Sequence, residues 1–174
     1  GEALEDIECS HVVIIQGDEP LIQTEHLKRI TDAIRLNPSH DSWNSTCELN
    51  SKDELCNPNV VKAAINNEER ILYFFRNSPS FKDPHKQFLY IKKVQGLIAF
   101  KKETLMQIVT SPTNICEEIE SIEQLKIIAN GFNIFSVHQK NQVPSINTRE
   151  DLNDLYKYFE NNNNELELTK TLIK

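Results

Sequence analysis

Short apolar runs alternate along the chain with polar turns and amphipathic stretches. The first run, residues 12–15, consists only of β-branched side chains. Such a run predicts a strand covered on both faces, as at the centre of a parallel sheet. It ends in the polar corner Gln16, Gly17, Asp18, Glu19 and Pro20. Because the carboxyl end of a buried strand faces the functional crevice of an open α/β sheet, we expect a site at this corner.

The later pattern switches repeatedly between strand and helix periodicity. A helix is expected from residue 24, and turn formers at residues 37–46 predict a loop that leads into a short strand at 46–49. The other predicted elements are a hairpin from the runs 60–65 and 71–75, a strand at 94–100, a helix start near Glu103, a strand at 132–139 and a helix at 148–159.

One helical stripe is more regular than the others. Ile119, Ile122, Leu125 and Ile128 fall on one face, and Gly131 is well placed as the stop of the helix. The pattern predicts one continuous helix here. Strands that alternate with helices indicate an α/β fold, with residues 1–160 in one domain and residues 161–174 as a polar tail.

The amino-acid composition limits which kinds of ligand and which cellular location are expected for this protein. The net charge of −7 and the lack of a basic stripe argue against nucleic acid and anionic lipid, so an anionic ligand would need a metal. No apolar run reaches the ~18 residues of a membrane span, and the start resembles no signal peptide, so we expect a cytoplasmic location. The four cysteines include no C-x-x-C pair, which argues against zinc.

The corner offers a candidate for metal chemistry. Asp18 and Glu19 follow the apolar run directly, and Mg²⁺ prefers carboxylate oxygens with several waters retained. Asp18 is therefore the best single candidate for a metal ligand. The alternative from the residues alone is a turn shaped by Gly17 and Pro20, with both acids facing water.

Six segments in order carry a resemblance to a known family. They are "VVIIQGDEPLI", "NPNVVKAAI", "ILYFFRNSP", "KVQGLIAF", "ESIEQLKIIANG" and "INTREDLNDL". Together they resemble the cytidylyltransferases that activate 3-deoxy-manno-octulosonate (Kdo), the acid sugar of lipopolysaccharide. The resemblance spans residues 7–159, and the Q-G-D-E-P corner is its most specific part.

The resemblance implies a fold and an activity. It implies a Rossmann-like, GT-A-like nucleotidyltransferase domain of three layers, usually dimeric. Such enzymes couple CTP to the sugar acid with Mg²⁺, giving the CMP-sugar and pyrophosphate. Since the family begins with an arginine- and lysine-bearing phosphate loop that is not found before the corner here, we expect this chain to correspond to the C-terminal two thirds or so of such a domain, inactive by itself.

The resemblance also assigns roles to single residues. It implies that Asp18 is a magnesium ligand, that Gln16 approaches the sugar and that Arg76 faces the sugar acid, where a guanidinium suits a carboxylate. Without the resemblance, a surface salt bridge explains Arg76 equally well. Glu123 and Gln124 match residues that hold sugar hydroxyls, whereas periodicity alone favours the exposed side of a helix.

Two positions depart from the family pattern. Asn147 stands where the family has a second metal-binding aspartate, and a neutral amide offers a metal an oxygen but no charge. Val94 replaces a histidine of the sugar pocket, beside Gln95, which we take as a further substrate-binding candidate and as a sign of a modified sugar. The alternatives are a cytidylyltransferase for a nonulosonate sugar and a catalytically silent binding or dimerisation module.

Overall fold

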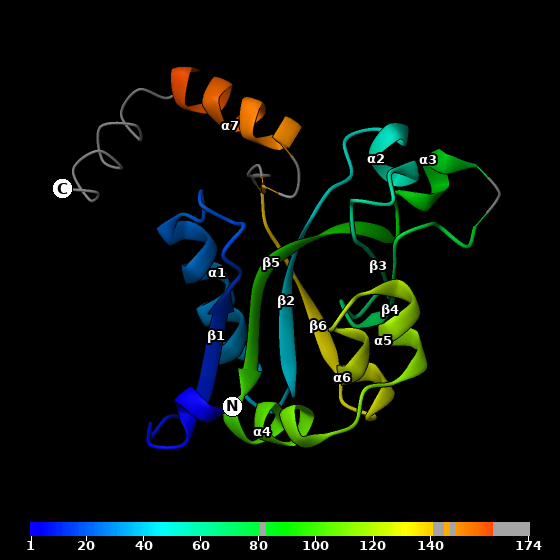
Figure 1. Ribbon diagram of the computed structural model, residues 1–174. Coiled ribbons are helices and arrows are strands. Elements are labelled where there is room, and N and C mark those ends of the chain that lie inside the picture. Colours follow the sequence, from blue (N-terminus) through cyan, green and yellow to red (C-terminus); the bar gives the residue numbers. More distant parts are fainter. Residues whose placement is uncertain (81–82, 141–144, 147–148, 162–174) are drawn as a thin grey trace.

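The computed structural model describes residues 1–80, 83–140, 145–146 and 149–161. At its centre is a six-stranded mixed sheet in the order β4-β3-β5-β2-β6, with β1 also paired to β5 (Figure 1). The strands are β1 (His11–Ile15), β2 (Ser42–Cys47), β3 (Lys62–Ile65), β4 (Ile71–Phe75), β5 (Ile91–Lys101) and β6 (Ile134–His138).

The long strand β5 organises this sheet. Its first residues pair with β3, and its last residues lie between β1 and β2, all antiparallel. β2 is parallel to β6, so the carboxyl ends of β1, β2 and β6 point to the same edge of the sheet. This common edge is where the chain leaves β1 for the Q-G-D-E-P corner.

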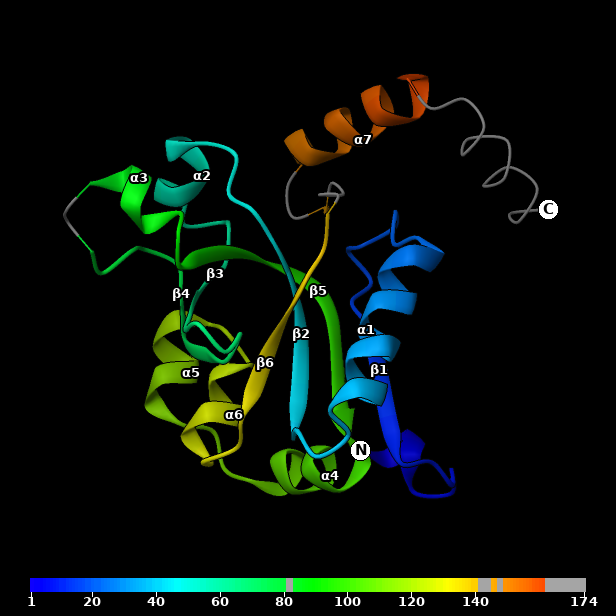
Figure 2. The ribbon, with the colours of Figure 1, turned by 180° about the vertical axis from the view of Figure 1, so that it is seen from behind.

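Helices cover both faces of the sheet. Ile30 and Ile34 of the first long helix pack with Trp43 on one face, while Leu105 and Leu125 pack with β5 on the other. The helices are η1 (Glu2–Leu4), α1 (Thr24–Leu36), α2 (Lys52–Cys56), α3 (Pro84–Gln87), α4 (Lys102–Thr110), α5 (Ile115–Glu120), α6 (Leu125–Ala129) and α7 (Arg149–Asn161). The expected three-layer α/β architecture is confirmed (Figures 1 and 2).

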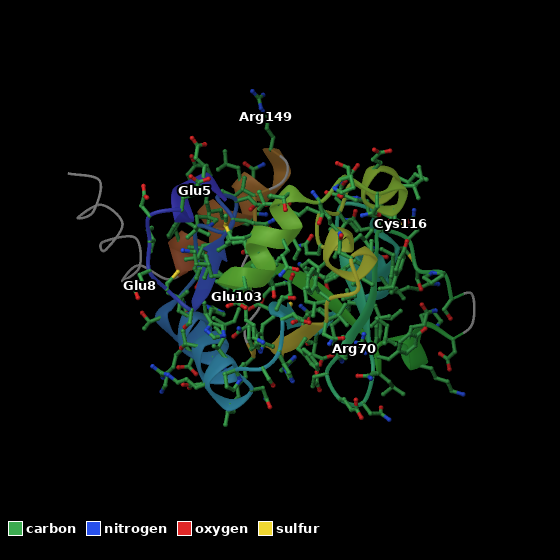
Figure 3. The ribbon with its side chains drawn as sticks, turned by 90° about the horizontal axis from the view of Figure 1, so that it is seen from below. Glu5, Glu8, Arg70, Glu103, Cys116 and Arg149 are labelled. Carbon is green, nitrogen blue, oxygen red and sulfur yellow. The ribbon has the colours of Figure 1, made fainter. Side chains whose placement is uncertain are left out.

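The two sides of the molecule carry different parts of the chain. Figure 3, seen from below, shows Glu5 and Glu8 on the side of β1 and Arg70 and Cys116 on the side of the β3–β4 hairpin. Helix α7 lies beyond the common edge in Figure 1, and its Leu155 packs on Leu21, just after the corner.

Of the helices in the described ranges, none has the length and apolar character to span a bilayer.

The prediction that residues 12–15 form a fully covered central strand is wrong. Among the described residues β1 pairs with β5 alone, and it does so antiparallel. Ile14 and Ile15 are 38% and 47% exposed. A β-branched run signals a strand, but it carries no information on how many neighbours that strand has.

Two further predictions need correction. The expected continuous helix is two helices, α5 and α6, because Ser121 adopts a left-handed backbone with φ 52° between them. Gly131, with φ 81°, does follow α6 as expected. The expected loop at 37–46 contains most of β2, whose six residues are all buried. Its polar side chains find partners there; Thr46 and Ser136, for example, share a hydrogen bond of 2.7 Å between their hydroxyls.

The hairpin, the strand at 94–100 and the last strand and helix are confirmed as β3–β4, β5, β6 and α7. The predicted tail, residues 161–174, lies almost wholly outside the described residues.

Candidate functional site

The acidic corner, residues 16–20, lies at the common edge of the sheet. Asp18 is half-buried, and its backbone carbonyl accepts a hydrogen bond of 2.9 Å from the N–H of Ile146. Its carboxylate has no hydrogen-bond or ion-pair partner in the part of the chain that the structure describes. Glu19, in contrast, is only 6% exposed. The two neighbouring acids therefore have different surroundings, and Asp18 is the one that can receive a ligand.

Glu19 is held by the backbone of β5. Its Oε1 accepts a hydrogen bond of 2.7 Å from the N–H of Gly96, while its buried Oε2 has no partner among the described residues. Burial raises the pKa of Glu19, and the Gly96 bond opposes that rise. The enclosed carboxyl is thus a structural part of the corner.

Gln16 joins the corner to the start of α6. Its Nε2 donates to Oε1 of Glu123 over 3.2 Å, across 107 positions of sequence. The neighbouring Gln124 is buried and donates to Oδ1 of Asn44 on β2 over 3.4 Å. The structure therefore brings Gln16, Glu123 and Gln124 together, and it excludes the simple exposed-helix interpretation for Gln124.

Gln95 directly precedes Gly96 on β5 and is also buried, at 4% exposure. Its backbone carbonyl accepts a hydrogen bond from Nδ2 of Asn44, over 2.9 Å. Neither its Nε2 nor its Oε1 has a partner among the described residues, and the same is true of Oε1 of Gln139. A buried amide without partners is costly, so these atoms are candidates to meet a ligand or water. Val94, in place of the family's histidine, packs on the apolar core instead.

Arg76 makes contacts that neither sequence interpretation anticipated. Its Nε, Nη1 and Nη2 donate to the backbone carbonyls of Glu120, Pro58 and Ser121 over 2.7, 3.0 and 3.1 Å. Its own N–H donates to the Glu120 carboxylate over 3.0 Å. It forms no surface salt bridge with a described residue. Arg76 therefore ties the end of β4 to the connector between α5 and α6, shortly before Glu123.

Lys62 extends this arrangement on β3. It is fully buried, and its Nζ donates to the carbonyls of Asn57, over 2.6 Å, and of Arg76. Desolvation lowers the pKa of Lys62 to about 8. We call Lys62 and Arg76 the basic clamp, because both cations are bound by backbone carbonyls.

The corner fits a magnesium ion in its donor chemistry. Mg²⁺ binds through one or two carboxylates, keeps several waters and completes its shell with substrate phosphates. The accessible carboxylate of Asp18 satisfies the first need. Asn147, the other predicted ligand, lies outside the described residues. No group of three or more His, Cys, Asp or Glu side chains suited to a metal occurs in the described ranges.

Sequence reasoning missed two residues of the site. The sequence pattern predicts a loop at Asn44, whereas in the structure Asn44 lies in β2 and links the backbone of Gln95 to Gln124. Gly96 gave only a weak signal, a single glycine inside a strand pattern, which is typical of a close backbone approach.

A three-layer α/β domain whose acidic corner, after β1, meets a glutamate directly before α6 has the architecture of a nucleotidyltransferase. The chain belongs to the cytidylyltransferase family, whose family model matches residues 1–140. The 3-deoxy-manno-octulosonate cytidylyltransferase of Elusimicrobium minutum is 31% identical over 166 residues, which cover 92% of this chain and 67% of that protein. The enzyme of the same name from Chlorobium chlorochromatii is 33% identical, covering 87% of this chain and 62% of its own. The chain spans about two thirds of the length of these relatives.

Solved structures support the same fold. A CMP:2-keto-3-deoxy-manno-octonic acid synthetase complexed with CTP superposes with a TM-score of 0.83 at 24% identity, covering 92% of this chain and 66% of the other. The 4-diphosphocytidyl-2C-methyl-D-erythritol synthase of Anaerococcus prevotii gives a TM-score of 0.57 at 16% identity, covering 91% and 64%. The expected nucleotidyltransferase fold is confirmed.

Proposed function

We propose that this protein takes part in the transfer of CMP from CTP to a 3-deoxy-2-keto sugar acid, Kdo or a close relative, with release of pyrophosphate. Family membership and the names of the relatives support this proposal. The observation that carries it is the contact between Gln16 and Glu123, because it assembles polar side chains from distant segments beside the accessible carboxylate of Asp18. The product would serve lipopolysaccharide or surface-glycan synthesis.

The reaction is an in-line substitution at phosphorus. The anomeric hydroxyl of the sugar bonds to the α-phosphorus of CTP, the bond from that phosphorus to the bridging oxygen breaks, and the hydroxyl proton leaves to solvent or base. Positioning and charge neutralisation supply most of such catalysis. Gln16, Glu123 and Gln124 would hold sugar hydroxyls. Asp18, with Asn147, would hold Mg²⁺, which when bound neutralises phosphate charge.

Arg76 can serve the sugar carboxylate as well as the fold. Each of its three guanidinium nitrogens donates one N–H to a carbonyl, and among the described residues one N–H on Nη1 and one on Nη2 have no partner. Two parallel N–H groups match a carboxylate. In this proposal the clamp orients Arg76 and the sugar acid binds the remaining donors.

Two features bear on which sugar is used. The side chain of Val94 supplies no hydrogen bond, and the side-chain amide of Gln95, which has no partner among the described residues, can bond a ligand or water. A modified sugar acid with an additional polar group, such as an amino-substituted keto sugar, fits this change. A nonulosonate is the second candidate.

The test is pyrophosphate release by the full-length gene product with CTP, Mg²⁺ and a panel of keto sugar acids. Asp18→Asn should reduce turnover by about 100-fold or more, since it removes the ligand charge. Asp32→Asn, which changes an exposed carboxylate on α1 paired with Arg35, is the matched control and should be neutral.

Failure of the folded wild-type protein to release pyrophosphate with any sugar would favour a catalytically silent module. Titration with Mg²⁺ separates the two, because a silent module has no need to bind metal through Asp18. We further propose a cytoplasmic homodimer, which light scattering and cell fractionation would test.

A further inference from the structure

The ladder between β1 and β5 ends in an unusual way. Pairing is regular from His11 with Lys101 to Ile15 with Leu97, so Gln16 should face Gly96 as a hydrogen-bonded pair. In such a pair each residue donates its N–H to the carbonyl of the other. The N–H of Gln16 does donate to the carbonyl of Gly96, over 2.8 Å. The reciprocal bond is absent.

Glu19 supplies hydrogen-bond partners for the two backbone groups that the missing bond would have joined, the carbonyl of Gln16 and the N–H of Gly96. The carbonyl of Gln16 accepts the N–H of Glu19 over 3.2 Å, which closes a turn across the corner. The N–H of Gly96 donates to Oε1 of Glu19 over 2.7 Å. One residue therefore ends the ladder and closes the turn, while every backbone group of the pair stays satisfied.

This arrangement leaves no room for a side chain at position 96. A Cβ atom there would lie 2.6 Å from Oε1 of Gln16 and 2.6 Å from Cγ of Glu19. Both side chains thus cross the backbone of β5 at the one position without a side chain. The amide of Gln16 that lies against Gly96 is the same amide that donates to Glu123.

We propose that Glu19 is a positioning residue: its carboxyl replaces the ladder partner of Gly96 and thereby holds Gln16 toward Glu123 and Asp18 toward the ligand. The inference rests on the proposed function for its kinetic consequence. Glu19 itself binds no metal in this proposal, although it neighbours Asp18. The role requires an acceptor oxygen and a side chain of the right length, and it does not require a negative charge.

This distinction defines the variants. Glu19→Gln keeps a carbonyl oxygen of the same reach, whereas Glu19→Ala removes the acceptor. Glu25→Gln and Glu25→Ala, at an exposed carboxylate on α1 that pairs with Arg29, are matched controls. Thermal unfolding confirms that each variant is folded.

The first measurement needs no substrate. The chain has four glycines, so labelling with ¹⁵N-glycine gives a simple amide spectrum in which Gly96 is assigned by triple-resonance experiments on the wild-type protein. We expect the Gly96 amide to shift and to exchange with solvent at least about tenfold faster in Glu19→Ala. In Glu19→Gln it should remain protected. An unchanged Gly96 amide in a folded Glu19→Ala would overturn the proposal.

The second measurement is kinetic. Glu19→Ala should lower kcat/KM for the sugar by about tenfold or more, and Glu19→Gln should restore it to within about threefold of wild type, with an unchanged Mg²⁺ requirement. Equal losses in both variants with a raised Mg²⁺ requirement would make Glu19 a metal ligand and overturn the proposal. If the wild-type protein shows no turnover, the proposed function fails, and the Gly96 amide alone decides the role of Glu19.

Discussion

The basic clamp and the acidic corner both contain polar side chains that are wholly or partly buried, but these side chains differ in their hydrogen-bond partners. Lys62 and Arg76 donate to backbone carbonyls at every side-chain nitrogen. Near the corner, Glu19 and Gln95 keep buried atoms that have no partner among the described residues. Satisfied buried groups stabilise a fold, whereas unsatisfied ones cost free energy that a ligand can recover. We therefore expect clamp variants to change stability more than corner variants do, although in the proposed function Arg76 variants also weaken binding of the sugar acid.

The largest expected effect tests the clamp. Arg76→Ala removes the donors of three carbonyls, those of Pro58, Glu120 and Ser121, and should lower the free energy of unfolding by about 2–4 kcal/mol. Urea denaturation measures this loss. Arg35→Ala, which breaks an exposed ion pair with Asp32, should cost less than about 0.5 kcal/mol. A loss no larger for Arg76 than for Arg35 would show that the clamp does not support the fold.

The next effect concerns pH. The pKa of Lys62 falls from its ordinary 10.5 to about 8 in the folded protein because burial disfavours the ammonium. Between these values the unfolded chain binds more protons, so the free energy of unfolding contributed by Lys62 rises with pH. Wild type should gain about 1–3 kcal/mol relative to Lys62→Met between pH 7.5 and 10. Urea denaturation of both proteins at each pH measures the difference, and parallel curves would contradict the assigned pKa shift.

Whether the sequence predicts a feature of these two regions depends on how far apart in the chain the interacting residues lie. The hairpin and the corner are local patterns, and both were found. The predicted helix breaks at Ser121, whose carbonyl accepts a hydrogen bond from Arg76, 45 positions earlier, and no periodicity reveals that contact. The edge position of β1 depends on its neighbours, and the burial of Asn44 depends on Gln95 and Gln124. Gln16 and Gln124 could be proposed as site residues only through the family resemblance, because their contacts in the structure are also long-range.

A smaller effect tests the corner. Gln95→Met removes two buried polar atoms that have no partner in the described structure, and it should raise the free energy of unfolding by about 1 kcal/mol without ligand. It should also lower kcat/KM for the sugar, if Gln95 binds substrate. Gln124→Met is the matched comparison, because it breaks the bond to Asn44 and should destabilise by about 1 kcal/mol. Calorimetry gives the stability of both variants, and steady-state kinetics give kcat/KM. Destabilisation by Gln95→Met would mean that the Gln95 amide is already satisfied.

The smallest expected effect concerns two residues with a strained backbone, one in the connector before α6 and one in the turn between β3 and β4. Ser121 and Glu69 have φ of 52° and 60°, a conformation that glycine adopts without a steric cost. Ser121→Gly and Glu69→Gly should each stabilise the fold by about 0.5–1 kcal/mol in thermal unfolding. Only Ser121 lies in the connector that Arg76 holds before Glu123, so only Ser121→Gly should raise the KM for the sugar, by about twofold to threefold, through a looser approach of Glu123 to Gln16. Equal KM values in both variants would mean that the clamp and the corner are energetically independent, although they are joined by this short connector.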